Sequence, residues 1–214
     1  STFLDISLGN LRPLRIQVLG EVHQPGAYII SPSATLFSSI YYFKGPTVLG
    51  SLRDIKLIRS NKQIASIDFY DYLLTGKKIM DQKLQIDDVI YIPKRKKTVQ
   101  ITGAINREGI YEIKEDESLV NLINFSGGLK AEAYLGRAQV DRIVPFKERD
   151  KKGLDREIKD VNLSFLISNE ETFELFDGDK IKVFSIFESR SNIVSINGAI
   201  TRAGTYDLGD SLRL

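Results

Sequence analysis

The chain has 214 residues, of which 42% are hydrophobic and 27% are charged, a balance that is ordinary for a globular protein with a buried core. Its net charge of +2 gives no electrostatic reason to expect nucleic acid or a charged membrane surface as a partner. The absence of cysteine excludes disulfides, thiol catalysis and thiolate metal sites, and it is compatible with an oxidising compartment. No apolar run approaches the roughly 20 residues needed to span a bilayer.

The first 14 residues precede the organised part of the chain. Apolar residues alternate there before a Gly-Asn pair, so we predict an N-terminal extension or the end of an upstream domain. The segment lacks the charged and apolar regions of an export signal.

A 15-residue pattern at residues 16–30 recurs at residues 99–113 and 194–208. Each copy has alternating apolar residues, a glycine, a second glycine six positions later and a tyrosine two positions further on. The alternation predicts a β-hairpin with one buried face. The first glycine falls inside a strand, which indicates a bulge or a close backbone approach, and the second is expected in a type II turn with positive φ. The first glycines are Gly20, Gly103 and Gly198, and the second glycines are Gly26, Gly109 and Gly204.

A helix is predicted directly after the first hairpin. Ser33 or Thr35 would cap it, and an apolar face would follow at helical spacing. Gly45-Pro46 would end it. The residues of the apolar face are Leu36, Ile40 and Phe43.

More strands are predicted behind this helix. Residues 55–59 and 64–68 form two apolar runs joined by a polar turn, and residues 69–74 form a short helix that ends at Gly76. A closing strand at residues 89–92 completes the unit, because the following proline cannot donate to a ladder.

The second copy repeats these elements at an offset of 83 residues through the helix and 91 residues at the closing strand. It therefore contains eight additional residues, which we place in the charged loop 147–160. Asp116 or Ser118 would cap its helix, and Gly127-Gly128 would end it. A hairpin, a helix and further strands predict an α+β fold of tandem β-grasp units, each a mixed sheet packed on one main helix.

The repeat divides the chain into a first copy (residues 15–94), a second copy (98–187) and the truncated start of a third copy (193–214). Linkers this short predict an elongated, fairly rigid rod. Because the chain ends where the third copy should begin its helix, we expect it to be a piece of a longer protein.

Residues suited to catalysis or metal binding are few. His23 is the only histidine and lies at a hairpin tip, so turn surface explains it better than a metal site does. The carboxylates of Asp87-Asp88 and of Asp177-Gly178-Asp179 are neighbours within a turn, whereas glycoside hydrolysis needs a pair across a cleft. Gly127-Gly128 follows a helix, so it offers no helix N-terminus to a phosphate. We predict no enzyme, cofactor or metal site.

Basic and aromatic side chains are the candidates for ligand binding. The basic run 94–97 is either a solvated linker or a contact for anionic groups. Four arginines beside the post-helix strands suit the carboxylate of a sugar acid, although a solvated sheet edge explains them equally well. Tyrosine rings suit carbohydrate, with core or interface packing as the alternative. The candidates are Arg53, Arg59, Arg137, Arg142, Tyr41 and Tyr42, with Tyr70 and Tyr72 as a second aromatic cluster.

The pattern V-x-G-x-[VI]-x-x-x-G-x-Y, followed by a capped helix with a glycine stop and by a D-x-[IV]-x-[IV] strand, resembles the soluble-ligand-binding β-grasp (SLBB) domain. The tandem arrangement is similar to that of bacterial capsule and exopolysaccharide export proteins. This resemblance implies a periplasmic, outer-membrane-associated homo-oligomeric ring. Its β-grasp domains would form the wall of a polysaccharide conduit and would dock on an inner-membrane polysaccharide copolymerase.

Two classes of function stay open. The first is a non-catalytic module for the assembly or the wall of an export conduit. The second is a binding module that holds a soluble glycan or another small ligand, which a concave pocket lined by aromatic and convergent polar groups would favour. An enzyme is disfavoured because no nucleophile, base or metal set is present.

Overall fold

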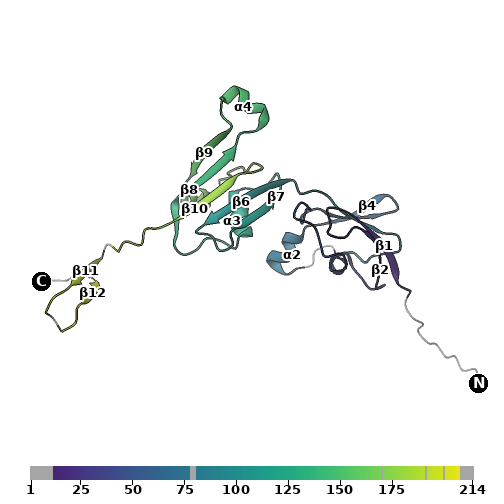
Figure 1. Ribbon diagram of the computed structural model, residues 1–214, viewed down its shortest axis with the longest axis horizontal. Helices are drawn as coiled ribbons and strands as arrows, with labels where there is room; N and C mark the ends of the chain where they lie inside the picture. Colours follow the sequence, from purple (N-terminus) through teal and green to yellow (C-terminus); the bar gives the residue numbers. More distant parts are fainter. Residues whose placement is uncertain (1–11, 78–80, 170, 191, 200, 208–214) are drawn as a thin grey trace, which may run out of the picture.

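The computed structural model describes residues 12–77, 81–169, 171–190, 192–199 and 201–207. Most of the predicted N-terminal extension and the predicted helix start of the third copy lie outside these residues. The described chain contains two five-stranded mixed sheets and a two-stranded hairpin, which follow one another along the molecule (Figure 1).

The first sheet has the strand order β2-β1-β5-β3-β4. Its central strands β1 and β5 are parallel, and all other neighbours are antiparallel. The chain therefore returns to the middle of the sheet with its last strand. The strands are β1 (Leu14–Gly20), β2 (Gly26–Ile30), β3 (Ile55–Arg59), β4 (Lys62–Ile67) and β5 (Val89–Ile92).

The second sheet has the matching order β7-β6-β10-β8-β9, and its register is the same. Gln17 lies opposite Val89 in the first sheet, and Gln100 lies opposite Lys180 in the second, as the two repeat offsets require. The predicted tandem α+β fold is therefore confirmed. The strands are β6 (Lys97–Gly103), β7 (Gly109–Ile113), β8 (Ala133–Ile143), β9 (Arg156–Val161) and β10 (Lys180–Ser185).

The helices begin where the capping residues predict. Thr35 and Ser118 each occupy the N-cap of the main helix with a capping box, and Asp68 and Asn162 cap the second helix of their copies. The first helix is shorter than predicted, because the backbone turns after Ser39 and reaches positive φ at Lys44 and Gly45. The helices are α1 (Leu36–Ser39), α2 (Phe69–Thr75), α3 (Leu119–Phe125), α4 (Phe146–Lys152) and α5 (Leu163–Ser168).

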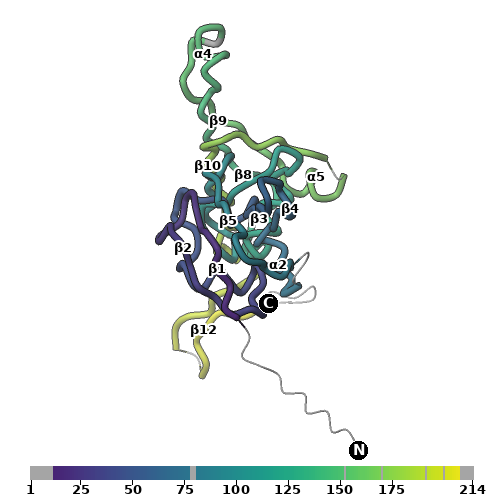
Figure 2. Tube along the Cα trace, turned by 90° about the vertical axis from the view of Figure 1, so that its right-hand side faces the viewer, coloured from purple at the N-terminus to yellow at the C-terminus, as the bar shows by residue number. Residues whose placement is uncertain are grey.

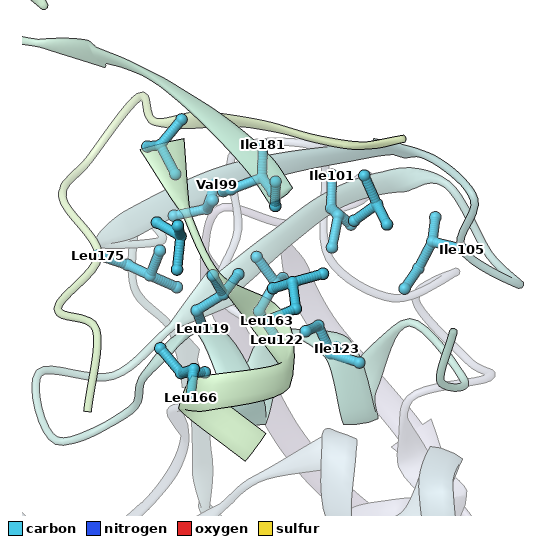
Figure 3. Packing of buried hydrophobic residues seen from close by; sticks show 14 of the residues in the cluster. Val99, Ile101, Ile105, Leu119, Leu122, Ile123, Leu163, Leu166, Leu175 and Ile181 are labelled. Carbon is cyan, nitrogen blue, oxygen red and sulfur yellow. The ribbon is translucent and has the colours of Figure 1, made fainter. Parts of the chain in front are cut away.

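Each sheet has its own hydrophobic core. In the second copy, the buried face of the sheet packs on α3 and α5 (Figure 3). In the first copy, Phe43 is fully buried although α1 ends before it, so its predicted place in the core holds. The labelled core residues of the second copy are Val99, Ile101, Ile105, Leu119, Leu122, Ile123, Leu163, Leu166, Leu175 and Ile181.

The extra residues of the second copy form an arm. The strands β8 and β9 continue past the sheet and are joined through α4, which lies at the top in both views, away from the two sheets (Figures 1 and 2). This arm falls in the charged loop 147–160 where the repeat comparison places the insertion.

The first glycine of each complete copy lies against the neighbouring parallel strand. Gly20 has a φ of +92°, and a Cβ there would lie 2.1 Å from Ile92 O. Gly103 has a φ of +96°, and a Cβ there would lie 2.0 Å from Val183 O. A larger residue would displace the backbone in either place.

The predicted positive φ at the second glycine is found at Gly26 (φ +151°) and not in the other two copies. Gly109 and Gly204 have no positive φ and instead begin the returning strands β7 and β12 (Gly204–Asp207). A Cβ at Gly109 would lie 3.5 Å from the Tyr111 ring, because residues two apart in a strand share a face. The hydroxyl of Tyr111 donates to Arg107 O at 2.8 Å. The tyrosine two residues after the second glycine therefore closes the hairpin loop.

The same closure occurs in the other two hairpins. Tyr28 donates to the carbonyl four residues earlier at 2.6 Å, and Tyr206 does so at 2.7 Å. The third hairpin pairs β11 (Ile193–Ile196) with β12.

None of the helices in the described residues is long and apolar enough to cross a bilayer.

Candidate functional site

An arginine holds a buried aspartate at the turn before the closing strand of each sheet. Asp88 and Asp179 are fully buried. Arg59 Nε donates to Asp88 Oδ1 at 2.8 Å, and Arg142 Nη2 donates to Asp179 Oδ2 at 2.7 Å. Each arginine also donates to the carbonyl five residues before its aspartate. Two of the predicted ligand arginines therefore have a carboxylate partner within the protein, for which a sugar acid would have to compete.

Arg53, another predicted ligand residue, lies between the two copies and is only 7% exposed. Its Nη2 donates to Asp68 Oδ2 at 2.8 Å in the first copy and to Glu117 Oε1 at 2.7 Å in the second. Its Nη1 donates to the backbone carbonyl of Glu112 at 3.2 Å. One guanidinium thus joins the end of the first sheet to the hairpin and helix start of the second copy.

Glu112 is bound by the first copy from several directions. Ser51 Oγ donates to Glu112 Oε1 at 2.8 Å, and Leu52 N donates to Glu112 Oε2 at 3.0 Å. The backbone N–H of Glu112 donates to the hydroxyl of Tyr70 at 2.9 Å. Lys114 adds an ion pair to Asp68 at 2.7 Å. We call these residues, together with Arg53 and Glu117, the junction network.

Aromatic rings cover the guanidinium of the junction network. The Arg53 Cζ atom lies 4.5 Å from the ring centroid of Tyr70 and 4.9 Å from that of Phe125. A cation over an aromatic face gains more when it is desolvated, as it is here. Tyr70 and Phe125 come from different copies, and their rings meet edge to face at 5.5 Å. The second aromatic cluster of the sequence therefore contributes to the joint between the copies.

The protonation states follow from these contacts. Burial alone would lower the pKa of Arg53, but its hydrogen bonds to Glu117 and Asp68 raise it above the ordinary value. Burial alone would raise the pKa of Asp68, but hydrogen bonds from Arg53 and Lys114 hold it below its usual range. Burial raises the pKa of Tyr70. Arg53 and Asp68 therefore stay charged at neutral pH.

A cleft of about 340 Å³ opens beside the junction network, between the two copies. Its rim includes Lys94 and Lys96 of the basic run and Lys114 of the second copy. Three acidic residues stand among them, so the charges of its lining nearly balance. The lining residues are Ser51, Arg53, Asp54, Ser66, Pro93, Lys94, Lys96, Glu112, Ile113, Lys114 and Glu115.

The remaining ligand candidates lie elsewhere. Tyr41 is 82% exposed and lines a shallow apolar pocket of about 180 Å³ with Tyr72, Phe37 and Phe69. Tyr42 is also exposed. The structure therefore brings Tyr41 close to the second aromatic cluster, which the sequence did not predict.

Arg137 is half-exposed and donates to Asp160 at 2.9 Å, with its guanidinium 5.1 Å from the ring centroid of Phe184. His23 is exposed at its hairpin tip. Among the described residues, no group of three or more His, Asp or Glu side chains is placed to hold a metal ion.

The repeated unit matches a known family. The model of the SLBB domain matches residues 15–68 and 98–153, which together make up more than half of the chain. The chain belongs to the SLBB domain family. These two matched SLBB segments coincide with the hairpin, main helix and following strands of the two sheets.

The SLBB chain is also similar to the polysialic acid transport protein KpsD of Escherichia coli, which matches in two forms of the same name. The identity is 31% over 112 residues, which are 51% of this chain and 20% of KpsD. This chain therefore aligns with about a fifth of the length of that relative.

Sequence reasoning did not find the junction network, but the sequence contains a signal for it. Arg53, Asp68 and Tyr70 occupy positions where the second copy has Gly136, Asn162 and Ser164. Residues that serve the fold recur in both copies, as the arginine–aspartate pairs do. Polar residues that occur in one copy only are therefore candidates for contacts between copies.

Proposed function

We propose that this chain is a non-catalytic periplasmic module of a capsular polysaccharide or exopolysaccharide export protein, associated with the outer membrane. It contributes to the assembly or the wall of the polysaccharide conduit. The observation that carries this proposal is the tandem of SLBB domains whose sequence is similar to a polysialic acid transport protein. We take the domains to span residues 15–94 and 98–187, with a third beginning at residue 193.

The junction network supports a role as a wall. A conduit wall needs modules that keep a fixed angle, and Arg53 shares its donors between Asp68 and Glu117 in a water-poor space. Separating the copies would break the bonds from Arg53 to Glu117, from Ser51 and Leu52 to Glu112, and from Lys114 to Asp68, all of which cross the joint. Subunits of constant shape can close into a ring through heterologous contacts. In the full-length protein we therefore expect a homo-oligomer that encloses polysaccharide and docks on an inner-membrane copolymerase.

The absence of catalysis is part of the proposal. Asp88 and Asp179 directly precede the closing strands of the two sheets, and both are fully buried. Each accepts hydrogen bonds from an arginine and from a backbone N–H in its turn. A carboxylate held in this way is not placed to take a proton from a substrate.

A second candidate is a module that holds a soluble glycan. The aromatic pocket of Tyr41, Tyr72, Phe37 and Phe69 favours it, because flat rings offer stacking faces to a sugar. The basic rim of the junction cleft would suit an acidic residue of such a glycan. The pocket has few polar groups to fix the orientation of a sugar, so we rank this candidate second.

The two candidates can be separated by experiment. Light scattering and electron microscopy of the full-length protein would measure its assembly, and calorimetry with polysialic acid and with neutral dextran oligomers would measure glycan affinity. The conduit module is supported if the full-length protein forms uniform rings and the isolated chain has no measurable affinity for either glycan. A monomer whose affinity for either glycan is lost in Tyr41→Ala supports the binding module and contradicts our first proposal.

A variant of the joint gives a sharper control. Arg53→Met breaks the junction network without touching the aromatic pocket of Tyr41. If the conduit proposal is right, this variant of the full-length protein forms irregular or smaller assemblies. Rings indistinguishable from those of the natural protein would show that the fixed joint is not needed for assembly.

A further inference from the structure

The second sheet carries an exposed apolar groove at the end where the chain leaves it. The groove has a volume of about 380 Å³ and is rich in aromatic side chains. Phe187 is 91% exposed, and Tyr134 is 47% exposed. Large aromatic groups gathered on a surface commonly mark an interface. The lining residues are Tyr134, Arg137, Phe184, Ser185, Ile186 and Phe187.

The repeat relates this groove to the junction cleft. The offset of 83 residues carries Ser51 to Tyr134 and Asp54 to Arg137. The offset of 91 residues carries Pro93 to Phe184, Lys94 to Ser185 and Lys96 to Phe187. The groove on the second copy is therefore formed by residues equivalent to those that the first copy contributes to the junction cleft.

In the first copy, the equivalent surface is covered by the second copy. The opposite side of the cleft is formed by residues 112–115, which are the end of β7 and the residues that follow it. The strand β7 is the returning strand of the hairpin in the next copy. The surface therefore serves as the seat for the hairpin of the copy that follows in the chain.

A hairpin of the same kind follows the groove. The strands β11 and β12 pair as β6 and β7 do, and Asp207 occupies the position of Glu112. Both strands are largely exposed, and the hairpin lies apart from the second sheet (Figures 1 and 2). The linker from Val183 to Asn192 is four residues longer than the corresponding one from Ile92 to Lys97. Four residues extend the reach by up to about 14 Å, so the linker does not prevent docking.

We propose that the groove is the docking site for the third SLBB copy of this same chain, with β12 seated where β7 is seated in the first joint. The chemistry of the two joints differs. The donor Arg53 and its acceptor Asp68 are replaced by Gly136 and Asn162, and aromatic side chains stand where Ser51 and Lys96 stand. The second joint is therefore held by apolar burial and resists salt, whereas the first is held by ion pairs.

Cross-linking of introduced cysteines tests the docking, because the natural chain contains no cysteine. Tyr134→Cys with Asp207→Cys places a pair at the positions equivalent to Ser51 and Glu112, whose side chains are 2.8 Å apart. A short bifunctional maleimide should join the pair within one molecule. The yield should not change in 1 M salt.

Two further variants make the result decisive. Lys151→Cys with Asp207→Cys puts one cysteine on the arm, which lies at the opposite end of the molecule from the hairpin in Figure 2, and should give at least tenfold less product. Phe187→Ser in the Tyr134–Asp207 pair should lower the yield severalfold, because it removes the most exposed ring of the groove. Equal yields from the arm pair and the groove pair would overturn the proposal, as would product formed only between molecules.

Discussion

Arg53 donates to Glu117 across 2.7 Å, although 64 residues and the boundary between two SLBB copies separate them. The two side chains are 5% and 12% exposed. Asp68 takes the other edge of the same guanidinium, so one cation neutralises carboxylates from both copies. These three charges contribute to the relative placement of the copies, together with the hydrogen bonds to Glu112.

Replacing Arg53 by methionine should separate the two copies. It leaves Glu117 without its cation and Asp68 with Lys114 alone. Removing one member of a buried ion pair typically costs about 3–5 kcal/mol. We expect each sheet to stay folded while the joint opens. Small-angle scattering should show a broader distribution of distances, and hydrogen exchange should rise at β7 without rising at β1.

Lys56→Met provides a matched control for that variant. Lys56 pairs with Asp54 on the surface at 3.3 Å, and both side chains are about 30% exposed. An exposed pair of this kind contributes about 0–1 kcal/mol. If this control opens the joint as far as Arg53→Met does, the junction network is not what holds the copies.

The joint should also weaken in acid. Hydrogen bonds from Arg53 and Lys114 outweigh the effect of burial and hold the pKa of Asp68 below its ordinary value of 3.8. A carboxyl with a lowered folded-state pKa stabilises the folded state above its unfolded pKa and loses this contribution as pH falls through the folded one. We therefore expect the scattering profile to stay constant above about pH 5 and to broaden below about pH 4.

The variant Asp68→Asn identifies the titrating group. It cannot titrate, and it keeps the shape of the side chain, so its joint should be weaker at neutral pH and less sensitive to acid. An acid transition of unchanged size in this variant would assign the effect to another carboxylate.

The glycines inside β1 and β6 should be intolerant of substitution. At Gly103, an alanine Cβ would lie 2.0 Å from Val183 O, and φ is +96°. The backbone would have to move, and we expect Gly103→Ala to cost more than about 3 kcal/mol in urea unfolding. Gly153 also has positive φ (+63°), but nothing lies within 4 Å of a Cβ there. Gly153→Ala should therefore cost only about 1 kcal/mol, from strain alone. Equal costs would show that the close approach is not the reason for glycine in β6.

Much of each copy was predictable because its signals are local. Alternation of apolar residues, the capping Thr35 and Ser118, and Gly76 at the end of α2 each act within a few residues. Comparison of the copies within the chain added the correspondence of their closing strands β5 and β10, whereas the pairing of these strands with β1 and β6 came from the structure. The hairpin glycine Gly109 misled us, because the sequence shows its spacing from Tyr111 but not that the ring lies over it.

The joint between the copies was not predictable in the same way. Arg53 was identified as a candidate for a ligand carboxylate, and the carboxylates that it meets are those of Asp68 and Glu117. The residue type was informative, but its partner depends on how two folded units sit against each other. No periodicity within one unit contains that information.

The two arginine–aspartate pairs offer a final prediction, because they have equivalent places in the two copies while their arginines differ in solvent exposure. The Arg142 side chain is 6% exposed, whereas Arg59 is 25% exposed, and both aspartates are fully buried. Asp179→Asn leaves a buried guanidinium without its counter-charge and should cost about 3–5 kcal/mol. After Asp88→Asn, Arg59 can turn toward water, so the cost should be about 1–3 kcal/mol. Hydrogen exchange at β10 would measure the loss of stability in Asp179→Asn, and hydrogen exchange at β5 would measure the loss in Asp88→Asn. A larger loss at β5 than at β10 would contradict the assignment of the difference to exposure of the arginine.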